Sequence, residues 1–249
     1  MQILETNDEV RVQAQHYSAI LSRKNGGLLT ALRSRKTGAT VLEGFGIYTD
    51  YGIYAERGYV GTRNESRSRI TINRANGRLL VTTTGALKGK VAPRDQLIHY
   101  KVTYAFDSSP HIYVDCQLMP SFERNEVRAF LAVRFRVPSL REWTVRTQRG
   151  FIHQDARIGP QRSYQDVIEP LDWHEPLIIF RTKTDGALAV TKVKCRAPTV
   201  LQNVIIHGEA FFLTWLDGRP APLLKSPYQM QFRLTVDQLP MSLSTTDER

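Results

Sequence analysis

Polar and apolar residues alternate with a period of two along much of this chain, and this pattern limits the folds that the chain can adopt. Such alternation is typical of β-strands that turn one face to a core, because successive side chains point to opposite sides. Segments that alternate, or that are rich in Val, Ile, Thr, Tyr and Phe, are predicted as strands: 10–14, 69–73, 99–106, 111–118, 129–137, 177–182, 187–193 and 229–236. Helical periods are scarce, so the sequence predicts a nearly all-β protein.

Turn signals lie between these strand candidates. Four of them contain Gly after Asn or Asp, residue types that accept the positive φ angles of tight hairpins: Asn25-Gly26-Gly27, Asn76-Gly77, Asp185-Gly186 and Asp217-Gly218. Ser108-Ser109-Pro110 serves the same purpose between two long strand candidates. Connections this short join antiparallel neighbours, so we expect antiparallel sheets without crossover helices.

Length and composition fit one domain over residues 1–249, because all-β sandwiches and barrels reach this size as one unit. Hydrophobic residues make up 41% of the chain, which is enough for a large core. The longest apolar runs are too short to cross a bilayer, and residues 1–10 are polar and acidic. We therefore expect a cytoplasmic protein with no membrane span and no secretory signal.

The two cysteines, Cys116 and Cys195, lie in strand-like segments without a partner at metal-ligand spacing. The sequence therefore indicates neither a metal site nor another cofactor. Buried free thiols are one reading of the pair, and a disulfide is the other. The choice depends on whether the two strands meet, which the sequence leaves open.

The formal charge of +10 attracts anionic partners, whether nucleic acid, acidic polysaccharide or an anionic surface. The Lys and Arg residues are spread along the chain, with one loose cluster between Arg57 and Arg74 that also fits a solvated strand face. No nucleic-acid-binding motif is present, so nucleic acid is disfavoured as a partner. Steeply salt-dependent binding to DNA would instead favour nucleic acid as a partner.

Residues 43–65 and 150–175 break the strand pattern and are predicted as long loops, which commonly carry binding sites. In the second loop, His153, Asp155 and Arg157 share one face if the segment is extended, and they could supply a general acid or base and a clamp for a carboxylate. An exposed strand edge with an ion pair explains the same pattern.

Trp173, His174 and Glu175 follow in the same loop and add an aromatic platform beside an imidazole and a carboxylate. An aromatic face suits the apolar surface of a sugar ring, although a Trp in a loop is also a common hydrophobic anchor. In the first loop, aromatic residues surround one guanidinium, which suits stacking on sugars as well as packing beneath the loop: Tyr51, Tyr54, Arg57 and Tyr59.

The opening segment, residues 9–42, contains two strand candidates, the Asn25-Gly26-Gly27 turn, a third strand and then Lys36-Thr37-Gly38. Gly27-Leu28-Leu29-Thr30-Ala31-Leu32 has the form Gly-Leu-(Ile/Leu)-Thr-x-Leu. Together with the hairpin at 100–115 and the strands at 211–218 and 228–236, this segment resembles the galactose mutarotase-like β-supersandwich superfamily. The resemblance spans most of the chain and implies a large, hairpin-linked antiparallel β-supersandwich.

That superfamily contains aldose 1-epimerases, polysaccharide lyases and non-catalytic sandwich domains of glycoside hydrolases, so the resemblance implies a carbohydrate ligand. The Asn-His-x-(Tyr/Phe)-Phe-Asn-Leu segment of aldose 1-epimerases is missing here, and no catalytic residue carries over from it. We therefore expect a carbohydrate-active protein. As an enzyme it would be a lyase or epimerase with His153 as acid or base, Arg57 or Arg157 on a sugar carboxylate and Trp173 stacking.

The alternative is a non-catalytic binding or structural sandwich domain of a larger glycoside-processing enzyme, which the missing epimerase segment favours. The partner is then a carbohydrate, neutral or anionic. The sequence leaves open whether the chain forms a homo-oligomer or joins a larger enzyme.

Overall fold

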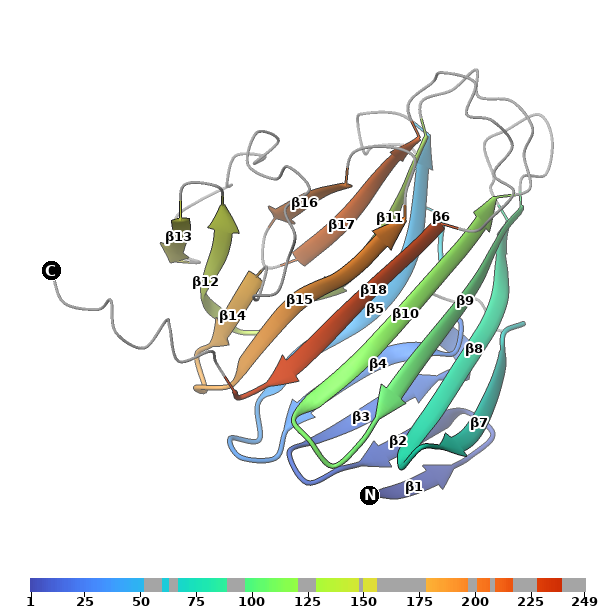
Figure 1. Ribbon diagram of the computed structural model, residues 1–249, viewed down its shortest axis with the longest axis horizontal. Coiled ribbons are helices and arrows are strands. Elements are labelled where there is room, and N and C mark those ends of the chain that lie inside the picture. The colour runs from blue at the N-terminus through green and yellow to red at the C-terminus, as the bar shows by residue number, and fades with distance from the viewer. Residues whose placement is uncertain are drawn as a thin grey trace, which may run out of the picture.

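The computed structural model describes residues 1–51, 60–62, 67–88, 97–120, 129–147, 150–155, 178–196, 201–206, 209–216 and 228–238. Two antiparallel sheets pack face to face in these residues and form a sandwich (Figure 1). We call them sheet A, which lies behind in Figure 1, and sheet B, which lies in front.

Sheet A has the strand order β1-β2-β3-β4-β5-β11-β17-β16, and β6 pairs with β5 beside this path. Its strands are β1 (Gln2–Glu5), β2 (Glu9–Gln13), β3 (Tyr17–Ser22), β4 (Leu28–Ser34), β5 (Thr40–Tyr51), β6 (Val60–Gly61), β11 (Ala129–Arg136), β16 (Leu201–Ile206) and β17 (Glu209–Leu216). A short 3-10 helix, η1 (Arg23–Asn25), joins β3 to β4.

Sheet B has the order β13-β12-β14-β15-β18-β10-β9-β8-β7. Its strands are β7 (Arg69–Ala75), β8 (Arg78–Lys88), β9 (Leu97–Phe106), β10 (His111–Pro120), β12 (Leu140–Thr147), β13 (Gly150–Asp155), β14 (Ile178–Thr182), β15 (Ala187–Arg196) and β18 (Tyr228–Val236). Consecutive strands are hairpin neighbours over β7 to β10, whereas β18 returns from the end of the chain to lie between β10 and β15.

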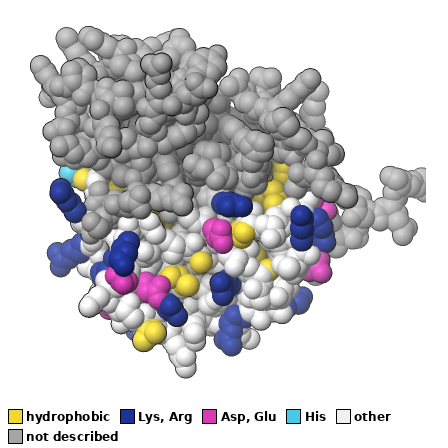
Figure 2. Space-filling view, turned by 180° about the vertical axis from the view of Figure 1, so that it is seen from behind, with side chains coloured by type: hydrophobic (Ala, Val, Ile, Leu, Met, Phe, Trp, Pro, Cys, Tyr) yellow, Lys and Arg dark blue, Asp and Glu magenta, His cyan; other side chains and the backbone are white. Residues whose placement is uncertain are grey.

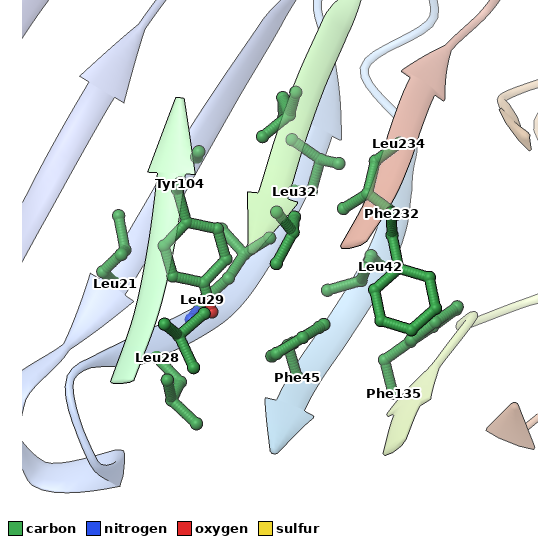
Figure 3. Packing of buried hydrophobic residues seen from close by; sticks show 14 of the residues in the cluster. Leu21, Leu28, Leu29, Leu32, Leu42, Phe45, Tyr104, Phe135, Phe232 and Leu234 are labelled. Atoms are coloured by element: carbon green, nitrogen blue, oxygen red, sulfur yellow. The ribbon is translucent and has the colours of Figure 1, made fainter. Parts of the chain in front are cut away.

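The core fills the space between the sheets, and strands such as β2, β3 and β10 give it alternate residues. Aromatic pairs cross from one sheet to the other, including Phe45 with Tyr104 and Phe135 with Phe180, whose ring centroids are each 5.9 Å apart in edge-to-face geometry. Figure 3 shows Tyr104 of β9 reaching toward leucines of sheet A. This shared core requires both sheets to fold together.

Sheet B also holds the backbone of the turn between η1 and β4. The Tyr104 hydroxyl accepts a hydrogen bond from the Leu29 N–H at 3.2 Å, and Figure 3 shows these two groups side by side. The Tyr100 hydroxyl donates to the Gly26 carbonyl at 3.1 Å, and the Thr83 hydroxyl donates to the Gly27 carbonyl at 2.7 Å. These bonds bring residues more than fifty positions apart into fixed contact.

Gly27 is required in this turn for two reasons. Its φ is +67°, a region that favours glycine. A Cβ atom at this position would lie 2.6 Å from Thr83 Cγ2 and 2.9 Å from Ile70 Cγ1, which is too close for any side chain. The double glycine of the turn therefore serves the approach of the two sheets as well as the hairpin.

The opposite end of the sandwich is closed by a second set of bonds between the sheets. The Tyr17 hydroxyl donates to the Asp107 carbonyl at 3.3 Å, and burial raises the pKa of this phenol well above its ordinary value. The Ser34 hydroxyl donates to the Asp237 carboxylate, whose other oxygen accepts from the Ala187 N–H at 2.9 Å. Both ends of the core are therefore tied by polar contacts.

The predicted all-β fold and its strands are confirmed where the structure describes them. Asn76, Gly77 and Asp185 have positive φ values of 51°, 73° and 59°, as their hairpin turns require. The Asp217-Gly218 turn lies outside the described residues. The single domain over 1–249 stays a prediction.

The predicted loops are wrong at their starts. Residues 43–51 belong to β5 and residues 150–155 to β13. In β5, glycines hid the strand signal, yet Phe45 and Ile47 are buried and β5 is paired on both sides, by β4 and β11. Tertiary pairing thus overrides the weak strand propensity of glycine.

The register settles the relation between Cys116 and Cys195. Both residues lie opposite Met230, one on each side of β18. Two strand spacings separate them by about 10 Å, whereas disulfide-bonded Cα atoms lie less than about 7 Å apart. Cys116 is a buried free thiol whose pKa is raised by its burial.

No helix of the described residues is both long and apolar enough to cross a membrane.

Replacing Tyr104 with Phe should lower the free energy of unfolding by about 1–3 kcal/mol, because the buried Leu29 N–H loses its acceptor. Urea denaturation measures the change. Tyr113→Phe is the matched control, because the Tyr113 hydroxyl makes no hydrogen bond in the described part of the chain. Equal stability of the Tyr104 variant and wild type would show that this bond between the sheets contributes nothing.

In a Cys195→Ser variant, the remaining Cys116 thiol should not react with Ellman's reagent in the native state, because the side chain is fully buried. One equivalent should react in guanidinium chloride. Rapid labelling of the native protein would contradict the described packing of β10.

Candidate functional site

Sheet B turns a band of polar side chains away from the core. Apolar residues of β10 and β18 alternate into the core, so the intervening polar residues lie on the outer face. The register aligns them in rows that cross the sheet: Lys101–Gln117–Gln229, Thr103–Asp115–Gln231 and Ala105–Tyr113–Arg233–Thr191. We call the residues of these rows the outer-face cluster.

Asp115 lies at the centre of the cluster and is held from two strands. The Gln229 amide nitrogen lies 2.9 and 3.1 Å from the two carboxylate oxygens, and the Gln117 amide donates to Oδ2 at 3.2 Å. A carboxylate has about four acceptor sites, so Asp115 retains capacity for a further donor. The glutamine hydrogen bonds and the half-buried position restrict the orientation of the Asp115 carboxylate.

Arg233 and Thr191 face each other across β18 and β15. Arg233 Nε and Thr191 Oγ1 are buried and have no hydrogen-bond partner in the structure. Buried polar groups are nearly always paired, so two neighbouring unpaired groups mark a departure from ordinary packing. Arg233 also forms no ion pair with any described residue.

Tyr113 lies between the Asp115 row and the turn end of β10. The Arg78 guanidinium carbon is 4.8 Å from the centre of the Tyr113 ring, and Arg78 Nε is 3.4 Å from the Asp107 carboxylate. This chain of contacts fixes the ring, because a cation over an aromatic face is attracted by its quadrupole.

His111 occupies the next outward position of β10, where its Nδ1 lies 3.0 Å from the Thr235 hydroxyl. Desolvation lowers the pKa of His111 from its ordinary value, and the charge of Arg233 lowers it further, whereas the Asp107 carboxylate opposes this shift. The imidazole is therefore held toward its neutral form beside the cluster.

These groups can bind a ligand that both donates and accepts hydrogen bonds. A carboxylate, glutamine amides, a guanidinium and an ammonium project from one rigid sheet face. Tyr113 is two residues from Asp115, about 7 Å along the strand, whereas His111 is about 14 Å away. Asp115 and Tyr113 are therefore the pair that one small ring could bridge. Among the described residues, no group of three or more His, Cys, Asp or Glu is placed to hold a metal ion.

The structure does not bring the predicted site residues to this cluster. His153 and Asp155 lie on β13, the edge strand of sheet B, opposite Thr144 and Glu142. Five strand spacings, about 24 Å, separate β13 from β10. Tyr51 ends β5 in sheet A, opposite Ala129. The remaining predicted residues lie outside the described residues: Tyr54, Arg57, Tyr59, Arg157, Trp173, His174 and Glu175.

Sequence reasoning missed Asp115, Gln229 and Arg233, since the search for chemistry concentrated on loops. A signal was present, because polar side chains at alternate positions of 113–117 and 229–233 point away from the core of two long strands. Asp115 and Gln229 are 114 positions apart, and only the pairing of β10 with β18 brings them together.

No protein-family model matches the sequence, and no curated protein matches it either. Solved structures do match the fold. The galactose 1-epimerase of Lactobacillus acidophilus superposes with a TM-score of 0.54 at 9% identity, over 96% of this chain and 98% of that one. A GalM/aldose epimerase homologue from C. elegans gives 0.51 at 10% identity, over 93% and 99%. This chain has the galactose mutarotase-like fold.

The mutarotase-like sandwich also matches part of a larger protein. The 4-alpha-glucanotransferase of Thermococcus litoralis gives a TM-score of 0.50 at 10% identity, over 96% of this chain but only 39% of that one. The superfamily resemblance in the sequence is thus confirmed for the fold, and identities this low extend the match no further than architecture.

The free energy of unfolding should fall as the pH drops below about 6.5, the ordinary histidine value. The pKa of His111 is lower in the folded state, so as the pH falls the unfolded chain takes up a proton on this residue before the folded protein does. The free energy of unfolding therefore decreases between the ordinary histidine pKa and the lower pKa of folded His111. His111→Gln should make the urea stability less sensitive to pH across that window. An unchanged pH dependence in the variant would contradict the assignment.

Proposed function

We propose that this protein binds carbohydrate on the outer face of sheet B, with Asp115 as the central acceptor. The observation that carries the proposal is the Asp115 carboxylate, held by Gln229 and Gln117 with acceptor capacity left over. Sugar hydroxyls need fixed acceptors and donors at short spacing, and carboxylate and amide side chains supply both.

The fold supports the same ligand class. Matching structures are named as a galactose 1-epimerase, an aldose epimerase homologue and a 4-alpha-glucanotransferase, and these names refer to sugar chemistry. Fold likeness is an analogy, so the proposal relies on the residues of the outer-face cluster for its chemistry.

Two versions of the proposal differ in catalysis. In the enzyme version, an epimerase or lyase, Asp115 takes a proton from the bound sugar and Tyr113 supplies one across the ring. In the other version the chain is a non-catalytic sandwich domain of a larger glycoside-processing enzyme. The match to 39% of the glucanotransferase favours this second version.

The loop residues of the sequence prediction form a competing placement of the site. There His153, Asp155, Arg157, His174 and Glu175 would carry catalysis, and the aromatic residues with Arg57 would bind the sugar. His153 and Asp155 of this placement lie on β13, whereas Asp115 lies on β10, so single substitutions distinguish the two placements.

Asp115→Asn should weaken sugar binding about tenfold or more, because hydrogen bonds to a charged acceptor contribute about 1.5–3 kcal/mol. Calorimetry with galactose, glucose and uronic acid oligosaccharides measures the affinity. Asp8→Asn is the matched control, since Asp8 lies in the exposed turn between β1 and β2, where it pairs with Lys24.

Loss of binding in His153→Ala but not in Asp115→Asn would move the site to β13. Anomer exchange on the same aldoses and unsaturated product from the uronic acid oligosaccharides test catalysis. Binding without either activity supports the non-catalytic version. No binding to any sugar of the panel overturns the proposal.

A further inference from the structure

A groove opens at the end of the sandwich where Tyr17 and Ser34 join the two sheets. The turns after β2, β4 and β9 and the end of β18 lie side by side there, at the lower end of Figure 1. The groove has a volume of about 820 Å³, and its described lining is Gln15, His16, Arg35, Lys36, Pro110, Val236, Asp237 and Gln238. A smaller hollow of about 160 Å³ continues it past Lys36 toward Arg141 and Arg181.

Two basic side chains line the groove without an ion-pair partner among the described residues. The Arg35 guanidinium donates to the Ala14 carbonyl at 3.1 Å, and neither Arg35 nor Lys36 forms an ion pair within the described part of the chain. Asp237 adds one carboxylate to the same lining, where its two oxygens accept from Ser34 and from the Ala187 N–H, and it forms no ion pair with Arg35 or Lys36 within the described part of the chain. His16 adds an imidazole to the same lining.

The basic groups of the adjoining hollow are different. Arg141 pairs with Asp185 at 2.9 Å, and Arg181 pairs with Glu142 at 3.2 Å. Figure 2 shows the opposite side of the molecule from Figure 1, where dark blue Lys and Arg side chains are scattered and several lie beside acidic ones. Arg35 and Lys36 differ from these residues, because they are exposed side chains that line the groove and form no ion pair with any described residue.

The groove is framed rigidly on both sides. On one side, Tyr17 bonds to Asp107 and Arg35 N–H donates to the His16 carbonyl at 3.0 Å. On the other, Ser34 and Ala187 hold Asp237, and the Val236 N–H donates to the Pro110 carbonyl at 3.0 Å. A preorganised cationic groove loses little entropy when it binds a ligand.

We propose that this groove is a second binding site, separate from the outer-face cluster, for a ligand that carries more than one sulfate or phosphate group. Arg35 and Lys36 supply charge-assisted hydrogen bonds to the oxyanions, and His16, Gln15 and Gln238 supply further hydrogen-bond donors. The volume lies in the usual range for small-molecule sites and exceeds the needs of one oxyanion. The described lining holds no Phe, Tyr or Trp, and the His16 imidazole is its single aromatic ring, which favours an anion without a base.

Inorganic pyrophosphate and a disulfated disaccharide are the probes, and the unsulfated disaccharide is the neutral control. Calorimetry at low and physiological salt should show that both anions bind, more weakly as salt rises, and that the neutral sugar does not bind in the groove. Binding of pyrophosphate alone assigns a phosphate ligand, and binding of the disulfated sugar alone assigns a sulfated one. Silence with both anions overturns the proposal.

Lys36→Gln should weaken binding of the anionic probe about tenfold, and Lys36→Arg should retain it, because Lys36 makes no hydrogen bond with the described residues that either change would lose. Arg74→Gln removes the same charge from the exposed strand β7 and should leave binding unchanged. If Lys36→Gln and Arg74→Gln weaken anion binding equally, the loss reflects the net charge of the protein alone, and the proposed site is overturned.

The proposed anion site does not depend on the proposed carbohydrate site. Asp115→Asn should leave pyrophosphate binding intact, and Lys36→Gln should leave binding of neutral sugar intact. Failure of one site therefore leaves the other standing.

Discussion

The hydrogen bonds from sheet B to the turn before β4 are the constraint on which the rest of the sandwich depends. Tyr100, Tyr104 and Thr83 place their hydroxyls against the backbone of residues 26–29, deep in an apolar core. Unpaired backbone groups at that depth would cost about 1–3 kcal/mol each. The two sheets can therefore associate closely only in the register that pairs these groups, and Gly27 leaves the space that this approach needs.

That register determines where polar groups appear elsewhere. Because the side-chain period of a strand is two, fixing Tyr104 inward also fixes Thr103 outward, and the pairing of β9 with β10 and β18 then places Asp115 and Gln231 in the same row. At the other end, the bonds of Tyr17 and Ser34 join the sheets beside the groove that Arg35 and Lys36 line. Core packing thus positions both candidate sites.

The sequence predicted what depends on local pattern. Strands with clean alternation, such as β10, and turns with Asn-Gly or Asp-Gly were predictable, because period and turn chemistry act over a few residues. The strand β12 was missed, since only Trp143 of its described side chains is buried, while Arg141 and Glu142 form ion pairs. The outer-face cluster was beyond local reasoning, because it needs the long-range pairing of β10 with β18.

The inner and outer faces of sheet B answer to different constraints. A TM-score of 0.54 at 9% identity shows that very different sequences can supply the same sandwich, because hydrophobic residues of suitable volume suffice to fill its core. The outward positions contribute little to that packing, so the fold does not require Asp115, Gln229 or Arg233. Arg233 is half-buried and forms no ion pair with any described residue, and burying a charge without a partner costs free energy. A bound ligand could offset the free-energy cost of burying Arg233, which the fold itself does not require. The side chains on the outer face of sheet B are therefore a better guide to function than the sandwich fold.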